Sequence, residues 1–433
     1  MDGDPAVEPE LDTFSLILPL PYRVACILVL GVWAWGLNLH YLSFLRIVQL
    51  LPTGFPILSH DHPTDAALQD VPALIRYPGR SSTKAPSHHL STYRLATLLT
   101  IPLGLSLLFF WVLTHGQPRR VINYEYLPQS YLILLLVLFV LPIQSLSRSG
   151  RYRFLSTLKR VSIGGIAEAQ DGKFGDILLA DVLTSYAKVL GDLFVSLCMF
   201  FSSGYSSTGK PDRGCGGRYL VPLIISLPSM IRLRQCLIEY LRVRRSNKKT
   251  GTIGPSGWGG QHLANALKYS SAFPVIVLSA LQRGSDPAQL GMSETGLFRL
   301  WLVAVFVNSF YSFYWDVAKD WDLSLFSTAP SSRASPEHPY GLRRHLYFHT
   351  KEVYYTAIVI DLLLRCTWSF KLSPHLDHFN DLEGGIFIME FLEVLRRWIW
   401  IFFRVETEWV RNNRGPAQDD ILLGEYNGKY DED

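Results

Sequence analysis

Ionisable residues lie inside several apolar stretches of this chain, where a charge needs a partner. Asp361 and Arg365 lie four residues apart in IVIDLLLRCTW, and Glu393 precedes Arg396 and Arg397 by three and four residues in EVLRRWIWIFF. Such spacings place opposite charges on one face of a helix. A charge at the centre of a membrane helix costs about 2.5–3.5 kcal/mol on insertion scales. These groups must therefore face one another, water or a ligand.

The cations in these stretches outnumber their evident acidic partners. They are Arg232, Lys268, Arg365, Arg396 and Arg397. The simpler explanation is that such cations form structural ion pairs between helices, or extend from a helix end to the membrane surface. This explanation suits Arg234 and Lys188. It suits Arg396 and Arg397 poorly, since adjacent helical residues point about 100° apart and both lie mid-span. Surplus positive charge in a polar cavity predicts an anion site, and the planar guanidinium group suits a tetrahedral oxyanion.

Helices that cross a membrane must position these residues. Hydrophobic residues make up 48% of the chain and charged residues 18%, whereas soluble domains have about 25% charged residues. The apolar residues gather in blocks of roughly twenty, the length that crosses about 30 Å of hydrocarbon. We therefore expect an all-α polytopic membrane protein, which excludes a soluble enzyme, an extracellular disulfide scaffold and a disordered adaptor. The nine candidate transmembrane helices cover residues 22–45, 95–114, 127–146, 176–201, 218–237, 262–281, 297–316, 353–372 and 385–405.

Lys and Arg are distributed unevenly between the loops that join these helices. Most of them lie in the first, third, fifth and seventh loops. Because cytosolic loops carry an excess of Lys and Arg, we expect a lumenal N-terminus and a cytosolic C-terminus. Residues 202–217, 246–260 and 327–340 are rich in Gly, Ser or Pro and are expected to be loops.

No motif for covalent, metal or ATP chemistry is present. The five cysteines have no metal-binding or redox spacing, so we expect them to be small buried hydrophobic residues. The chain contains no G-x-x-x-x-G-K-[ST] loop, no G-x-S-x-G elbow and no H-E-x-x-H motif. We therefore expect neither an enzyme nor an ATP-driven pump, and no cofactor or metal.

Six motifs along the chain resemble, in order and with compatible spacing, the signatures of the EXS family: FGDILLADVLTS, SMIRLRQCLIEY, HLANALKYS, YWDVAKDW, LLLRCTW and EVLRRWIWIFFRVETEW. That family includes the xenotropic and polytropic retrovirus receptor, which is a phosphate exporter, plant phosphate exporters and the fungal ER-retention-defective protein. The resemblance covers roughly residues 150–410 and implies an EXS-type helical bundle. It divides the chain into a lumenal segment (1–21), N-terminal helices with a cytosolic loop (22–146), the EXS domain (147–410) and a cytosolic polar tail (411–433).

The resemblance also implies a phosphate pathway. By motif, the phosphate-binding residues are Arg232, Lys268, Tyr269, Arg365, Arg396 and Arg397. The residues that line the pathway or balance its charge are Asp181, Asp316, Asp320, Glu393 and Trp368, of which the last two are expected near the gate. One polar pathway position of the exporters is occupied by Ala187 here.

Two differences from the exporters indicate which branch of the family this chain resembles. No SPX sensor domain precedes the first helix, and nine spans are one fewer than the exporters have, as in the short fungal branch of the family. That branch implies a multi-pass Golgi transporter that returns phosphate released by lumenal glycosylation to the cytosol and supports retention of glycosyltransferases. The partners implied are inorganic phosphate, membrane lipids, and Golgi glycosyltransferases or their sorting adaptors, with a homodimer left open and no nucleic acid.

Two alternatives stay open. In the first, the protein is a Golgi sorting factor that acts through its basic loop 242–249 and its tail 411–433 without transport. In the second, it is a plasma-membrane phosphate exporter, which the absence of a sensor domain disfavours.

Overall fold

The computed structural model describes residues 11–44, 88–141, 148–164, 173–202, 204–251, 257–284, 293–326, 339–343, 346–348, 350–372 and 383–413. Within these ranges the regular structure is helical, with no strand. The expected all-α fold is therefore confirmed for the described chain. Residues 1–10, most of the first loop, most of 327–340 and residues 414–433 of the polar tail lie outside the described residues.

The N-terminal part of the fold contains α1 (Thr13–Ile17), α2 (Leu20–Phe44), α3 (His88–Thr114), α4 (Pro118–Asn123), α5 (Tyr126–Val140) and α6 (Arg148–Ser162). The next part contains α7 (Lys173–Ser185), α8 (Ala187–Phe201), α9 (Leu220–Thr250), α10 (Gly260–Ser270) and α11 (Ala272–Gly284). The last part contains α12 (Glu294–Trp315), the π-turn η4 (Asp316–Asp320), the short turn η5 (Pro339–Gly341), α14 (Lys351–Arg365), the 3-10 turn η6 (Thr367–Leu372) and α16 (Glu383–Asn413).

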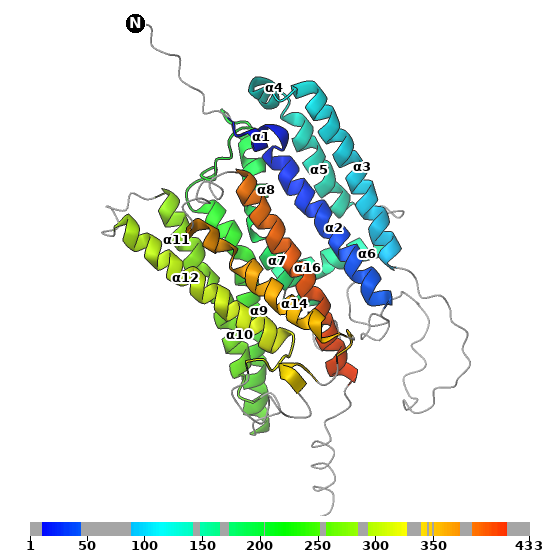
Figure 1. Cartoon of the computed structure of the whole chain (residues 1–433), viewed down its shortest axis with the longest axis vertical. Coiled ribbons are helices and arrows are strands. Elements are labelled where there is room, and N and C mark those ends of the chain that lie inside the picture. The colour runs from blue at the N-terminus through cyan, green and yellow to red at the C-terminus, as the bar shows by residue number, and fades with distance from the viewer. Residues whose placement is uncertain are drawn as a thin grey trace, which may run out of the picture.

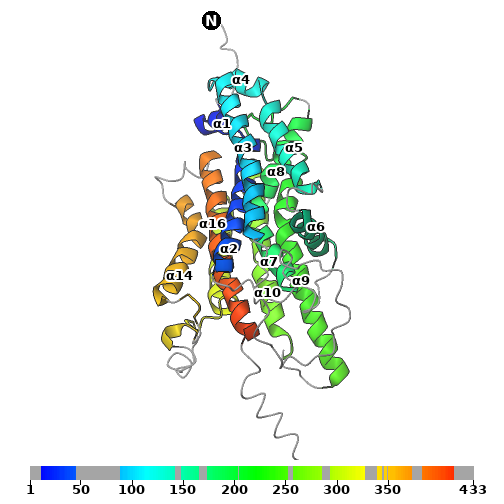
Figure 2. The same ribbon diagram turned by 90° about the vertical axis from the view of Figure 1, so that its right-hand side faces the viewer.

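The helices form an elongated bundle in which successive segments run in alternate directions (Figures 1 and 2). In Figure 1, α2, α3 and α5 lie on one side, α10, α11 and α12 lie on the other, and α16 runs between them. The short helices α1 and α4 lie at one end, here named the α1 end, and α16 finishes at the opposite end, here named the α16 end. α16 packs against α2, α7 and α14, which makes it a central helix.

Five described segments have the length and apolar character of a membrane span: Leu20–Phe44, His89–Thr114, Leu220–Thr250, Gly260–Arg283 and Glu294–Asp320. The bent pair α7 and α8 makes a sixth. All nine predicted segments overlap described helices, but α5 and α14 have 15 residues each, and α16 carries many charged residues. The expected helices are therefore present, while the count of nine spans rests on three that are shorter or more charged than an ordinary span.

Two sequence-based expectations are wrong. Cys198 and Cys215 form a disulfide that ties the end of α8 to the Gly-rich segment before α9, whereas the cysteines were expected to be small buried hydrophobic residues. Their separation of 17 residues gives no sequence signal, because only the fold of the Gly-rich segment brings them together. Residues 246–250, expected in a loop, continue α9, which ends where Gly251 adopts the left-handed conformation that glycine favours (φ 70°).

Helices α7 and α8 meet at an angle of 61°, and the break occurs at Tyr186. Its phenol group packs against Gly31 of α2, where a Cβ atom would lie 2.0 Å from the Tyr186 hydroxyl oxygen. Glycine at position 31 therefore permits the close approach that fixes the bend. The bend in turn sets the direction of Thr184 and Ser185, which face α16.

We expect Gly31→Ala to lower the thermal stability of the purified protein, because overpacking a well-filled site costs about 1–3 kcal/mol. Adding Tyr186→Phe removes the hydroxyl group that the new methyl group would meet, and should restore most of the loss. Melting curves of the detergent-solubilised variants measure both effects. A double variant no more stable than Gly31→Ala would show that this contact does not fix the bend.

Candidate anion-binding site in the helical bundle

A buried carboxylate at the end of α12 collects three cations. Asp316 is fully buried and begins the π-turn η4. Its oxygens accept from Lys268 of α10 at 2.9 Å, from Arg396 of α16 at 3.4 Å and from Arg365 of α14 at close range. Lys268 also reaches Asp320, at the end of the same turn, at 3.4 Å. One short turn thus joins α10, α14 and α16 through charge.

Asp361 closes this group from the side of α14. Its carboxylate is buried and accepts from Arg365 Nε at 3.1 Å and from Arg396 Nη1 at 3.4 Å. Asp316 and Asp361 therefore share the same two arginines. A buried charge cluster of this kind is stable only if the charges are paired and hydrogen-bonded, as they are here.

A second group lies where α7, α9 and α10 meet. Arg232 Nε donates to Asp181 at 2.7 Å, its Nη2 donates to the Tyr269 hydroxyl at 3.1 Å, and its Nη1 donates to Gln235 at 2.6 Å. The Tyr269 hydroxyl also donates to Asp181. Arg232 is buried and each of its donor nitrogens has a partner, so Asp181 and Gln235 hold its guanidinium group in place.

The adjacent arginines of α16 have different surroundings. Arg396 Nη2 donates to Glu393 at 2.5 Å, and the Glu393 side chain is 38% exposed. Arg397 is 5% exposed, and among the described residues no carboxylate lies within ion-pair distance of it. Its Nε donates to Ser185 at 2.9 Å and its Nη2 donates to Thr184 at 3.3 Å. Arg397 is thus held by two hydroxyl groups rather than by an acid.

One nitrogen of Arg397 has no partner. Nη1 is buried and forms no hydrogen bond within the described chain, while the guanidinium carbon lies 4.5 Å from the ring centre of Trp400. Ser185, which accepts from Arg397, donates to Glu393 at 3.0 Å. A buried charged donor without an acceptor is costly, and an anionic oxygen placed here would remove that cost.

By count, the network is neutral. Its cations are Arg232, Lys268, Arg365, Arg396 and Arg397, and its acids are Asp181, Asp316, Asp320, Asp361 and Glu393. The surplus of positive charge expected from the sequence is therefore absent among these residues. That expectation was wrong because carboxylates from different helices converge on the same cations. What remains is an uneven distribution: three cations contact Asp316, and none of the acids pairs with Arg397.

The structure brings together every residue of the predicted site except Trp368. That tryptophan lies in η6 and packs against the cluster of α11 and α12 side chains that includes Leu297 and Trp301. Its predicted position near the gate is therefore not part of the ionic network. Arg234, expected to be structural, donates to the backbone carbonyls of Val161 and Gly164 at the end of α6.

Sequence reasoning missed the hydroxyl groups that hold Arg397. Thr184 and Ser185 follow Asp181 by three and four residues, so all three share one face of α7. That spacing was a usable signal. Gln235, three residues after Arg232, had the same kind of signal. The four-residue spacing indicates Asp361 as a partner of Arg365, but no sequence pattern indicates its contact with Arg396.

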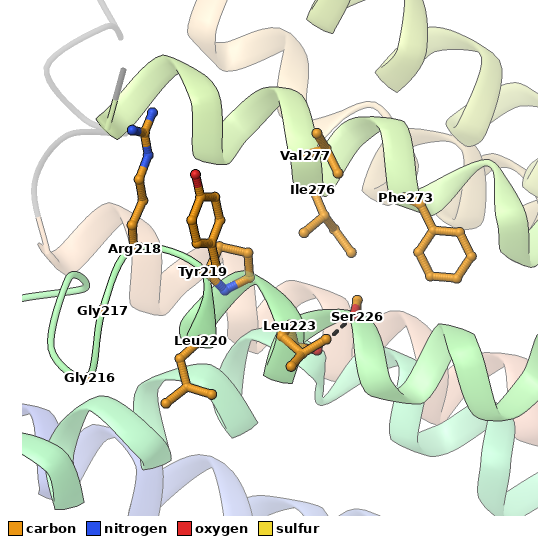
Figure 3. Close-up of a pocket in the computed structure, with 11 residues that line it drawn as sticks. Gly216, Gly217, Arg218, Tyr219, Leu220, Leu223, Ser226, Phe273, Ile276 and Val277 are labelled. Carbon is orange, nitrogen blue, oxygen red and sulfur yellow. Dashed lines mark hydrogen bonds between the residues drawn. The ribbon is translucent and has the colours of Figure 1, made fainter. Parts of the chain in front are cut away.

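A separate hollow of about 540 Å³ lies between α9 and α11 near the α1 end (Figure 3). Apolar side chains such as Leu223, Ile276 and Val277 line most of it. Its Ser226 hydroxyl already donates to the Leu223 carbonyl at 2.7 Å. Arg218 is the one charged residue of the lining and is exposed, whereas the cations of the ionic network are buried or nearly buried, so the network remains the candidate site.

Relatives match almost the whole chain. The sequence profile of the EXS family matches residues 18–410. Protein ERD1 homolog 2 of Schizosaccharomyces pombe is 28% identical over 401 residues, which cover 90% of this chain and 96% of that protein. Protein ERD1 of Kluyveromyces lactis is 29% identical over 351 residues, covering 78% and 85%. Solute carrier family 53 member 1 of Homo sapiens is 30% identical over 254 residues, covering 55% of this chain and 33% of that protein. The profile match thus includes the helices that sequence analysis had set apart at 22–146.

Asp316→Asn should destabilise the protein strongly, because breaking a buried ion pair from one side costs about 3–5 kcal/mol. Arg397→Gln removes no carboxylate's partner and should cost much less. Adding Lys268→Met to Asp316→Asn restores equal numbers of acids and cations but leaves Asp320 without its lysine, so it should recover only part of the loss. Melting curves compare the variants. Equal losses for Asp316→Asn and Arg397→Gln would contradict the assigned pairing.

Proposed function

This chain belongs to the EXS family of helical membrane proteins, and on that basis we propose that it conducts inorganic phosphate through the centre of its bundle. The observation that carries the proposal is Arg397, a buried cation with an unused donor and no acidic partner among the described residues. A phosphate oxygen at Nη1 would complete its hydrogen bonds.

The surroundings of Arg397 suit phosphate in particular. The hydroxyl groups of Thr184 and Ser185 donate to the Asp181 carbonyl and to Glu393, and by turning away from these acceptors they would donate to an oxyanion. Arg396 lies next in sequence with a planar fork of donors. A purely structural role is the competing explanation, since Arg397 also stacks on Trp400. Stacking satisfies the face of the guanidinium group but leaves the Nη1 donor unused.

The neutral network gives a way to release the anion. Phosphate that approaches Arg396 competes with Glu393, whose side chain is 38% exposed and can move into water. When phosphate leaves, Glu393 returns to Arg396. Such competition keeps binding weak enough for conduction, which requires an ion both to enter and to leave. In this scheme Asp181, Asp316, Asp320 and Asp361 keep the remaining cations fixed.

We propose that the α1 end faces the lumen and the α16 end the cytosol. Lys and Arg are concentrated in the odd-numbered loops, which supports this orientation. The Cys198–Cys215 disulfide supports it independently, because Cys215 packs in one cluster with Leu20 at the start of α2 and disulfides persist in oxidising compartments.

We further propose that the protein acts in the Golgi membrane, returns phosphate released by lumenal glycosylation to the cytosol, and supports retention of glycosyltransferases. The similarity to ERD1 proteins over most of their length supports this assignment over a plasma-membrane exporter. A role in sorting has its own support. The last turns of α9 extend beyond the neighbouring helices (Figure 2), and they expose a basic surface formed by Arg242, Arg244, Arg245, Lys248 and Lys249.

Replacing Arg396 or Arg397 with Ala should reduce phosphate flux by at least about tenfold, since a hydrogen bond to a charged group contributes about 1.5–3 kcal/mol. Arg→Lys at either position should fail as well, because a compact ammonium group lacks the planar fork of donors. Radiolabelled phosphate uptake by proteoliposomes of the purified protein measures this. Arg245→Ala, an exposed arginine outside the network, is the matched control. Wild-type flux in both Arg→Ala variants would refute the site.

Transport and sorting can be separated by two sets of variants. Arg397→Ala should abolish flux, whereas neutralising the basic surface of α9 should leave flux intact. If retention depends on phosphate transport, glycosyltransferases should leave the Golgi only in cells with Arg397→Ala. Microscopy of a tagged glycosyltransferase provides the readout. Loss of retention with the α9 variant alone would favour the sorting role instead.

A further inference from the structure

A second set of charges lies closer to the α1 end, here named the upper cluster. Its members are Arg23 of α2, Lys188 and Asp192 of α8, Arg213 of the segment before α9, and Glu383 and Glu390 of α16. Glu390 precedes Glu393 by three residues, so the upper cluster adjoins the candidate site along one face of α16.

Glu390 is the unusual member of this cluster. It is 3% exposed, and its Oε1 is buried with no hydrogen-bond partner in the described chain. The charged groups that act on it most strongly are Asp192 and Lys188 of α8, followed by Arg213 and Arg23. Burial is thus the main effect on the Glu390 carboxyl group, and the largest effect of a charged neighbour comes from another buried acid, Asp192. An ionised carboxylate without a hydrogen bond is unfavourable in such a place.

The arginines of the cluster are engaged elsewhere. Arg23 donates to Glu383 at 2.6 Å, to the Ser15 hydroxyl at 2.7 Å and to the Leu18 carbonyl at 2.7 Å. Arg213 donates to Glu383 at 2.8 and 3.1 Å and reaches Asp192 at 3.5 Å. Lys188, which is exposed, is the remaining cation of the six groups. Arg283 at the end of α11 acts on Arg213 and Asp192 from outside the cluster. No arginine of the cluster is thus placed to hold Glu390 in its ionised form.

We propose that Glu390 is a proton-binding site whose protonation admits phosphate from the α1 end. With all six groups ionised, the upper cluster is neutral and ends in a carboxylate that repels an anion. When Glu390 takes a proton from water, the cluster has one net positive charge and no negative charge at that position. Phosphate can then pass Glu390 and reach Arg397. When the proton returns to water, the barrier is restored.

The inference rests on the proposed phosphate conduction and adds its dependence on pH. Wild-type flux should fall by at least about threefold as pH rises across about pH 5 to 8, the range of physiological proton switches. Glu390→Gln mimics the protonated form and should keep the low-pH flux across the whole range. Phosphate itself also titrates, but identically for both proteins, so the ratio of variant to wild-type flux isolates the role of Glu390. Glu294→Gln, an exposed acid on α12, is the matched control and should keep the wild-type profile.

A second variant covers the case in which Glu390→Gln does not fold. Lys188→Gln changes an exposed residue and removes the cation that favours ionised Glu390. The midpoint of the flux profile should therefore move to higher pH. A constant flux ratio for Glu390→Gln, or an unmoved midpoint for Lys188→Gln, would overturn the proton site while leaving phosphate conduction standing. Absence of wild-type flux at every pH would instead refute the proposed function itself.

Discussion

The convergence of three cations on Asp316 is the interaction on which the rest of the structure depends. Lys268, Arg365 and Arg396 come from three different helices, and each would be costly in a membrane without a partner. The π-turn makes the convergence possible, because it places Asp316 and Asp320 within reach of one lysine. The helices α10, α12, α14 and α16 must therefore lie side by side at this level.

A neutral network changes what conduction of an anion requires. If the cations were in excess, phosphate would bind simply by filling a positive cavity, and leaving would be slow. With five acids for five cations, phosphate conduction as proposed would require an anion to displace a carboxylate from any cation except Arg397, and Glu393, at 38%, has the most exposed side chain of the five acids. Arg397 offers a first contact for the anion, since its Nη1 has no hydrogen-bond partner in the described chain and is available before any ion pair breaks.

Much of the fold and the site could be predicted from sequence, for a physical reason. Membrane helices need long apolar runs, and a charge inside such a run is conspicuous, so both the segments and the residues Arg396, Arg397 and Asp316 stand out. The pairs within one helix, Asp361–Arg365 and Glu393–Arg396, follow from their spacing. The partners of Asp316 could not be predicted, because they lie 48 to 80 residues away. The same limit hid the Cys198–Cys215 disulfide. The bend at Tyr186 depends on Gly31, a contact between two helices that no local pattern reports.

The acidic and basic residues of α16 lie in separate parts of the helix. Counting from the α1 end, the helix presents Glu383, Glu390 and Glu393 before Arg396 and Arg397. An anion that enters from that end must pass carboxylates before it meets a guanidinium group, which is the reverse of an attractive funnel. In this arrangement the arginines would determine the affinity for the anion, whereas the acids that precede them would determine its rate of entry. Glu383 is held by Arg23 and Arg213, whereas Oε1 of Glu390 has no hydrogen-bond partner in the described chain, so the proposed barrier to entry depends on the charge of Glu390.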